Sequence, residues 1–184
     1  IIVISKCDNI RSSSSKFGNN GDDQDLSPYA WMKSKMVELI KNYKKWFDLD
    51  YEICYFFNVY GPRQIYDGKY ATVVAIFEKQ FLNNEKITVV KPGTQSRDFT
   101  HVYDIIDSLN MISKKSLCHE WHLRSGKNIK IIDLAKLFSN KIKYIEERKG
   151  ERFTSEDFYS DTNSLLNWNP KEKLEDWVTK VKKK

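Results

Sequence analysis

Tyr29 and Lys33 have the types and the spacing needed to move a proton. They begin a segment of helical composition, so side chains four residues apart are expected on one helical face. A free phenol has a pKa near ~10 and is a poor base at neutral pH, but an adjacent ammonium favours the phenolate. A serine hydroxyl from the run at 12–15 would steady the substrate oxygen that loses the proton. Together these groups suit proton transfer at a sugar or alcohol hydroxyl while a hydride leaves the same carbon.

The same spacing also arises on ordinary amphipathic helices, with the aromatic ring in the core and the lysine in solvent. The elements predicted around Tyr29 and Lys33 therefore help to decide between proton transfer and ordinary helix packing. A helix is predicted at 28–47, with Ser27 as its N-cap and Pro28 at its first position. The aromatic and apolar run at 51–57 is typical of a buried parallel strand.

Helical and extended patterns alternate along the rest of the chain. We predict helices at 71–82, 101–113, 130–139 and 174–181, strands at 1–4, 86–90, 120–123 and 142–145, and turns at 58–64 and 92–93. This alternation favours an α/β domain with a largely parallel sheet.

The composition is that of a globular protein, with 40% hydrophobic and 14% aromatic residues. No apolar run approaches the ~20 residues that a membrane span needs, so no membrane segment is predicted. Cys7, Cys54 and Cys118 are widely spaced, which fits a reducing cytoplasm. His119 and His122 have no third ligand at metal-binding spacing, so no metal site is predicted.

The formal net charge of +6 invites a nucleic-acid interpretation. Much of the excess lies in the tail at 180–184 and on one face of the helix at 28–47, and the other basic residues are interleaved with Asp and Glu. This pattern indicates a solvated surface more than a phosphate-backbone footprint. A positive balance also suits an anionic small substrate such as a nucleotide diphosphate.

Four motifs follow one another in an order that resembles a known superfamily. They are a serine run at 12–18, Tyr-x-x-x-Lys at 29–33, Asn-Val-Tyr-Gly-Pro-Arg-Gln at 58–64 and Arg-Asp-Phe-Thr-His-Val-x-Asp at 97–104. The order resembles the extended short-chain dehydrogenase/reductase superfamily, and within it the NAD-dependent nucleotide-sugar epimerases of the UDP-glucose 4-epimerase kind.

The resemblance implies an α/β fold with an incomplete Rossmann-type, doubly wound parallel sheet and a small C-terminal α/β substrate-binding region. It assigns residues 1–60 to the carboxyl-terminal part of an NAD-binding domain. Residues 61–184 would form mainly the nucleotide-sugar-binding region, interleaved with the Rossmann part.

The resemblance also implies catalytic roles. Ser13 would be the catalytic serine, Tyr29 the proton-transfer base, and Lys33 the residue that binds the nicotinamide ribose and lowers the tyrosine pKa. Phe56 would lie where the strand end approaches the nicotinamide.

Four further positions match residues that hold a nucleotide-diphosphate sugar. Asn58 would contact the diphosphate, Arg97 and Arg148 would clamp it, and Glu151 would hold the nucleotide ribose.

Each of these positions also has a structural alternative. Asn58 can belong to a tight turn, Arg97 can pair with Asp98, and Arg148 can be solvated surface. His101 follows the family pattern but is predicted to be a structural hydrogen-bonding residue.

Some positions depart from the pattern. Ser14 and Ser15 stand where dehydratases carry an Asp-Glu pair and decarboxylases a glutamate, which favours epimerisation. Tyr55 stands where an arginine is usual. The glycine-rich turn that holds the cofactor pyrophosphate is expected before the serine run, where only eleven residues stand. The chain therefore resembles the carboxyl-terminal half to two-thirds of an epimerase.

The sequence thus predicts a cytoplasmic NAD-dependent UDP-sugar 4-epimerase in an N-terminally truncated form. The alternatives are a non-catalytic nucleotide-sugar-binding remnant, another extended short-chain enzyme (dehydratase or decarboxylase) and, least favoured, a small basic nucleic-acid-binding protein. By resemblance, the helix at 28–47 is expected to form a homodimer, with Trp31, Leu39 and Tyr43 at the seam or, alternatively, in the chain's own core.

Overall fold

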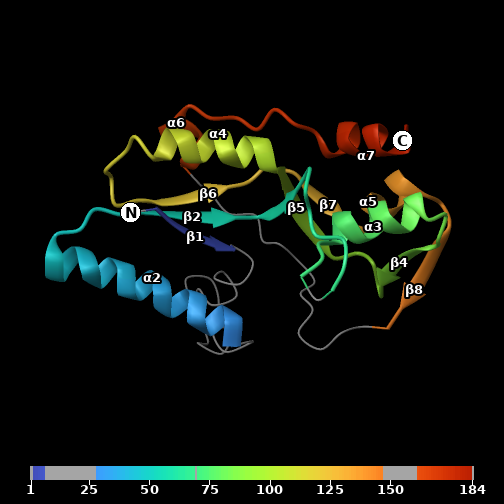
Figure 1. Ribbon diagram of the computed structural model, residues 1–184, viewed down its shortest axis with the longest axis horizontal. Helices are drawn as coiled ribbons and strands as arrows, with labels where there is room; N and C mark the ends of the chain where they lie inside the picture. Colours follow the sequence, from blue (N-terminus) through green and yellow to red (C-terminus); the bar gives the residue numbers. More distant parts are fainter. Residues whose placement is uncertain (1, 7–27, 69, 147–160, 184) are drawn as a thin grey trace. The chain divides into compact units, whose positions relative to one another are not determined.

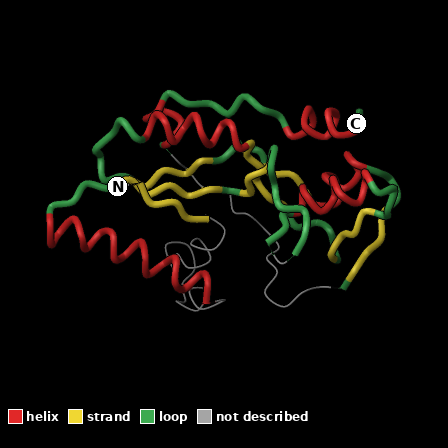
Figure 2. The backbone as a smooth tube through the Cα atoms, viewed as in Figure 1, coloured by secondary structure: helices red, strands yellow, loops and turns green. Residues whose placement is uncertain are grey.

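The computed structural model describes residues 2–6, 28–68, 70–146 and 161–183, and the others are grey in Figures 1 and 2. The chain forms two compact units. Unit 1 comprises Ile1–Phe57, Asp107–Leu123 and Tyr159–Trp168, and unit 2 comprises Asn58–Ile106, Arg124–Phe158 and Asn169–Lys184. None of the described helices is both long enough and apolar enough to cross a membrane.

Unit 1 is built on a parallel sheet. Its strands β1 (Ile2–Lys6), β2 (Glu52–Phe56) and β6 (Glu120–Leu123) lie in the order β1-β2-β6, with every pair parallel. In the central strand β2, Ile53 and Cys54 on opposite faces are both fully buried. Burial on both faces is what a parallel sheet between helices requires, and it confirms the predicted α/β class with a parallel sheet.

The helix α2 (Pro28–Phe47) runs along one side of this sheet, and the short helix α6 (Thr162–Leu166) packs on β6 (Figure 1). The predicted bounds of 28–47 are confirmed. Lys41 of α2 pairs with Glu120 at the start of β6, and Lys44 lies 2.7 Å from Asp50, just before β2. The carboxyl-terminal half of α2 is thereby tied to the starts of the strands.

A buried carboxylate holds the segment that leads into β6. Glu52 is 3% exposed, and its oxygens accept hydrogen bonds from the backbone N–H of Leu117 (2.6 Å) and His119 (3.3 Å). The indole Nε1 of the fully buried Trp121 donates to the same carboxylate at 2.5 Å. Glu52 thus accepts from three donors, and one of them, the indole N–H of Trp121, is buried and needs this partner.

Unit 2 contains two small sheets. One has the strand order β3-β5-β7, with β3 (Asn58–Tyr60) parallel to β5 (Ser96–His101) and β7 (Asn128–Lys130) antiparallel to it. The other pairs β4 (Ile87–Val90) with β8 (Ile142–Ile145) in parallel, side by side in Figure 2. The helices are α3 (Val73–Leu82), α5 (Ile131–Phe138) and α7 (Leu174–Lys182), while α4 (Val102–Ile112) begins in unit 2 and ends in unit 1.

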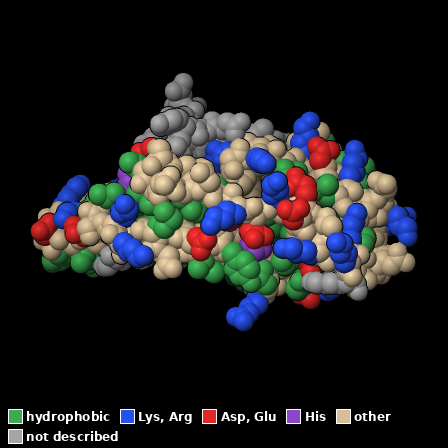
Figure 3. Space-filling model, turned by 90° about the horizontal axis from the view of Figure 1, so that it is seen from above, with side chains coloured by type: hydrophobic (Ala, Val, Ile, Leu, Met, Phe, Trp, Pro, Cys, Tyr) green, Lys and Arg blue, Asp and Glu red, His purple; other side chains and the backbone are tan. Residues whose placement is uncertain are grey.

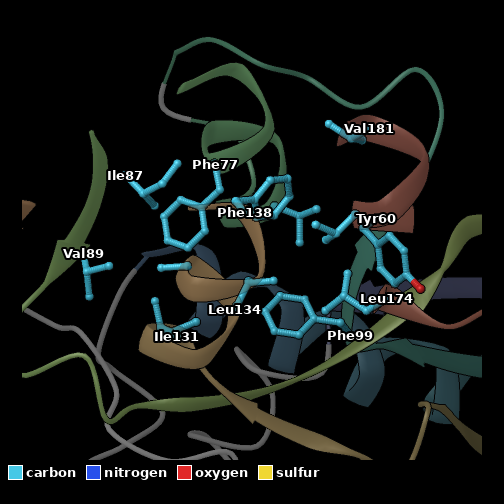
Figure 4. Close-up of a cluster of buried hydrophobic side chains, with 13 residues drawn as sticks. Tyr60, Phe77, Ile87, Val89, Phe99, Ile131, Leu134, Phe138, Leu174 and Val181 are labelled. Atoms are coloured by element: carbon cyan, nitrogen blue, oxygen red, sulfur yellow. The ribbon is translucent and has the colours of Figure 1, made fainter. Parts of the chain in front are cut away.

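The core of unit 2 joins the two small sheets to these helices (Figure 4). Phe77 of α3 and Phe138 of α5 meet edge to face with ring centroids 6.2 Å apart. Val89 of β4, Phe99 of β5 and Leu174 of α7 belong to the same cluster of buried side chains. Apolar burial of this kind stabilises the unit by roughly 25 cal/mol per Å² of surface removed from water.

Three strands differ from the sequence prediction, and one of them is β5 (Ser96–His101), for which no strand was expected. The prediction of a turn over 58–64 is wrong for Asn58–Tyr60, which forms β3 and pairs with β5 some forty residues later. Asn128–Lys130, for which no strand was expected, forms β7 on the other edge of β5. Asn, Gly and Pro residues locally indicate a turn. The extended conformation depends instead on pairing with a strand that is distant in the sequence.

We predict that Glu52→Gln destabilises the protein by about 2–3 kcal/mol, because the amide presents an NH2 group to N–H donors that need an acceptor. Denaturant unfolding followed by circular dichroism measures this loss. The matched control is Glu85→Gln, since Glu85 is exposed and its carboxylate accepts from the Asn83 side chain at 3.1 Å. A loss below about 1 kcal/mol for Glu52→Gln would contradict the anchoring role.

Candidate functional site

Four of the predicted site residues have described side chains. They are Lys33 and Phe56 in unit 1 and Asn58 and Arg97 in unit 2. The other predicted positions, Ser13, Arg148 and Glu151, lie outside the described residues, as does the side chain of Tyr29, whose backbone belongs to α2.

Lys33 lies toward the carboxyl ends of the strands of unit 1. Because Lys41 pairs with the first residue of β6, the eight residues back to Lys33 carry the helix about 12 Å along the sheet. From Glu120 to Leu123, β6 itself advances about 10 Å. The half-buried Lys33 therefore lies level with the end of β6. The neighbouring strand β2 ends at the same level, at the half-buried Phe56.

The carboxyl ends of parallel strands are where ligands bind in Rossmann-type sheets. Tyr29 precedes Lys33 by one helical turn, so α2 carries both residues of the predicted pair to this end of the sheet. A lysine and an aromatic ring at these strand ends are suited to a nicotinamide nucleotide, whose ribose hydroxyls accept from an ammonium and whose ring packs on an apolar face.

In unit 2, Asn58 and Arg97 come from the neighbouring strands β3 and β5. The side-chain Nδ2 of Asn58 donates to the backbone oxygen of Asp98 at 3.0 Å, so part of its hydrogen-bonding capacity fixes β3 against β5. Arg97 is half-buried, and its Nη1 donates to the backbone oxygen of Ser96 at 2.8 Å. Both contacts position side chains that the sequence assigns to diphosphate binding.

Asp98 anchors the turn that follows β6. It is fully buried, and its carboxylate accepts from Arg124 Nε at 3.1 Å and from three donors at 2.8 Å: the backbone N–H and the hydroxyl of Ser125, and the backbone N–H of Gly126. The described ion pair of Asp98 is thus with Arg124. Sequence analysis missed this role of Asp98.

The histidines are occupied in separate structural contacts. His119 Nε2 lies 3.2 Å from Asp161 Oδ1, whereas the ring of His122 stacks on Tyr55 with centroids 4.9 Å apart. His101, only 3% exposed, accepts a hydrogen bond from the backbone N–H of Tyr103 through Nδ1 at 3.3 Å. This bond satisfies a donor in the first turn of α4 and confirms the structural role predicted for His101.

Burial lowers the pKa of His101 below its usual range, although nearby carboxylates oppose the shift. Burial raises the pKa of the Cys54 thiol to about 12, so this cysteine stays protonated and unreactive. The sequence assigns proton transfer to Tyr29 and Lys33, and Lys33 is the one of these two whose side chain the structure describes.

The chain matches the model of the NAD dependent epimerase/dehydratase family over residues 7–120. A UDP-glucuronate 4-epimerase of Thermodesulfobacterium geofontis is 32% identical over 86% of this chain and 50% of its own length. The chain therefore belongs to the NAD dependent epimerase/dehydratase family.

Other relatives show the breadth of that family. A putative UDP-glucose 4-epimerase of Methanocaldococcus jannaschii is 29% identical over 85% of this chain and 52% of its own length. The UDP-glucuronic acid decarboxylase 3 of Arabidopsis thaliana is 31% identical over 74% of this chain and 41% of its own length. The chain spans about half the length of the curated relatives it matches.

Solved structures share the fold. The UDP-glucose 4-epimerase of Thermotoga maritima, solved with UDP-glucose, has a TM-score of 0.86 and 26% identity, covering 98% of this chain and 62% of that one. The UDP-glucuronic acid 4-epimerase of Bacillus cereus, in complex with UDP-glucuronic acid and NAD, has a TM-score of 0.80 and 26% identity, covering 99% and 61%. The architecture is thus that of Rossmann-type epimerases and dehydratases.

We predict that the buried His101 makes the stability of the protein fall as the pH falls. The unfolded chain binds a proton at the ordinary histidine pKa of ~6.5, while the folded chain keeps His101 neutral because its pKa is lowered. The contribution is therefore fully present above that pH and is lost progressively below it.

Unfolding in denaturant at pH 8.0, 7.0, 6.0 and 5.5 measures this dependence. His101→Asn is the test variant, because its Oδ1 can accept from the Tyr103 N–H but does not titrate. We expect a flatter pH profile for the variant, and parallel profiles for the two proteins would contradict the assignment.

Proposed function

We propose that this chain carries the catalytic helix and the nucleotide-sugar-binding region of an NAD-dependent UDP-sugar 4-epimerase. The observation that supports this most directly is the position of Lys33, one turn after Tyr29, at the carboxyl end of the parallel sheet of unit 1. The relatives named as UDP-sugar 4-epimerases support the same reaction. In this proposal, residues 1–60 serve mainly the cofactor and 61–184 mainly the substrate, interleaved.

Three residues of the chain take part in proton transfer in this proposal: Tyr29, Lys33 and Ser13. Tyr29, as phenolate, takes the proton from the hydroxyl at C4 of the sugar, and Lys33 stabilises that phenolate. Ser13 holds the oxygen while it changes from hydroxyl to carbonyl and back. Bound NAD supplies the acceptor, and then the donor, of a hydride. Tyr29 would then return the proton to the oxygen at C4, which restores the hydroxyl.

Binding of the diphosphate is assigned to residues outside the proton-transfer group. Arg97 would provide a two-pronged guanidinium contact, and Asn58 would add an amide hydrogen bond. Arg148 and Glu151 would contribute the second clamp and the contact to the nucleotide ribose. These groups hold the nucleotide while the 4-keto sugar turns, which is what inversion at C4 requires.

Two alternatives follow from the same family. Decarboxylases and dehydratases are among the relatives, but Ser14 and Ser15 offer no carboxylate for the additional proton transfer. A non-catalytic protein that keeps nucleotide-sugar binding is the second alternative. It differs from the epimerase by binding UDP-glucose without turnover.

The first experiment is NAD binding to the purified 184-residue chain by calorimetry, with and without UDP-glucose, followed by an epimerase assay. We predict turnover when a separate chain supplies the segment expected before the serine run, and under those conditions a loss of at least ~100-fold in kcat for Tyr29→Phe, the scale of general base catalysis. Tyr43→Phe, on the same helix, is the matched control and should retain kcat. UDP-glucose binding without NAD binding or turnover would refute the epimerase and support the binding protein.

We further propose that α2 mediates a homodimer. Large apolar side chains of α2 are exposed, including Trp31 (50%), Leu39 (47%) and Tyr43 (40%). Met32, Met36, Trp46 and Phe47 are exposed as well. An apolar surface of this extent on one helix is typical of an interface.

Sedimentation velocity tests the dimer. We predict a dimer at micromolar concentration, and at least a tenfold weaker association for Leu39→Lys, which places a charge in the apolar seam. Leu82→Lys on α3, where Leu82 is 49% exposed, is the control. A monomeric wild-type chain at 100 μM, or equal association of both variants, would contradict the proposal.

A further inference from the structure

A buried tyrosine connects α2 to the sheet through one carboxylate. The hydroxyl of Tyr55 in β2 donates to Glu120 Oε2 at 2.6 Å, and Lys41 of α2 pairs with the other oxygen, Oε1. The three side chains come from three elements of unit 1, namely β2, β6 and α2. They form the Lys41–Glu120–Tyr55 link.

The link is anchored firmly on the side of the sheet. Tyr55 is 3% exposed, and its ring stacks on His122 of β6 with an interplanar angle of 21°. Tyr55 and His122 are direct neighbours in the register of the two strands, so the ring is held from the side as well as through its hydroxyl. Glu120 has a side-chain exposure of 28%, and Tyr55 of the sheet holds it in place where it contacts Lys41 of α2.

On the helix side, apolar packing contributes little to the position of α2. Among the α2 side chains that the structure describes, Val37 is the apolar residue that is buried, whereas most of the other large apolar side chains face solvent. Lys41, one turn after Val37, makes the charged contact with the sheet. Among the other described ion pairs of α2, Lys35 with Glu38 is exposed and joins the helix only to itself, and Lys44 pairs with Asp48 and Asp50 in the segment between α2 and β2.

The link also reaches the two sides of the candidate site. Lys41 lies two helical turns after Lys33 on the same side of α2, so a shift at Lys41 is transmitted along a rigid helix to Lys33 and Tyr29. Tyr55 directly precedes Phe56 at the end of β2. One carboxylate thus fixes the helix that carries the base relative to the strand that ends at the site.

We propose that Glu120 is a positioning residue for proton transfer, acting through Lys41 on α2 and through Tyr55 on β2. The proposal rests on the proposed epimerase function. Displacement of a base by about 1 Å can cost up to ~100-fold in rate, so a loosened helix lowers kcat. Binding of the nucleotide diphosphate is assigned to unit 2 and should be little affected, which leaves KM almost unchanged.

Steady-state kinetics of four variants test the proposal. We expect Lys41→Met and Tyr55→Phe each to lower kcat roughly tenfold, with KM for the UDP-sugar within about twofold of wild type. Lys41→Arg keeps the charged contact and should restore kcat to within about threefold. Lys35→Met removes a lysine from the same helix without touching the sheet, and should leave kcat unchanged.

The measurements separate positioning from simple stabilisation. If Lys41→Met has a lower melting temperature but the same kcat as Lys35→Met, the proposal is overturned. Equal losses of kcat for Lys41→Met and Lys41→Arg would overturn it as well. Hydrogen exchange of the backbone amides at 33–41 provides a readout that needs no turnover. If the wild-type chain fails to epimerise, the proposed function is refuted, while faster exchange in Lys41→Met than in Lys35→Met still supports the link and equal exchange refutes it.

Discussion

Buried carboxylates that accept from backbone N–H groups hold the connections of this fold in place. Glu52 fixes the segment that enters β6, Asp98 fixes the turn that leaves β6, and Asp104 accepts from the backbone N–H of Lys171 (2.9 Å) and Glu172 (3.1 Å) ahead of α7. A carboxylate can satisfy several donors at once, which suits turns whose N–H groups have no strand or helix partner. Placement of the strand ends, and with them the candidate site, depends on these contacts.

The residues predicted to bind the cofactor belong to unit 1, and those predicted to bind the substrate belong to unit 2. The first segment of unit 1 ends at Phe57 and the first segment of unit 2 begins at Asn58, so Phe56, assigned to the cofactor, and Asn58, assigned to the substrate, belong to different units. Another boundary follows Leu123, directly before Arg124, the ion-pair partner of Asp98.

Lys and Arg side chains are interspersed with Asp and Glu on the face drawn in Figure 3, as the sequence analysis expected of a solvated surface.

The sequence predicted those elements whose signals are local. Ser27 and Pro28 mark the start of α2, and the apolar run at 51–57 marks β2. It failed for β3, β5 and β7, because their extended conformation depends on pairing with one another, which no local pattern encodes. The roles of Glu52 and Asp98 were hidden for a related reason: their partners are N–H groups, which every non-proline residue carries. Ser13, Arg148 and Glu151 remain predictions, since they lie outside the described residues.

The contact of Trp121 with Glu52 has an optical consequence. A fully buried indole whose N–H is bonded to a carboxylate sits in an environment of low polarity with one fixed charge, so its fluorescence differs in wavelength from that of the exposed Trp31 and Trp46 on α2. In unit 2, Trp177 donates to the buried Glu78 at 3.3 Å and reports on a different neighbourhood. The chain therefore contains its own spectroscopic labels, one set within each unit, without any added dye.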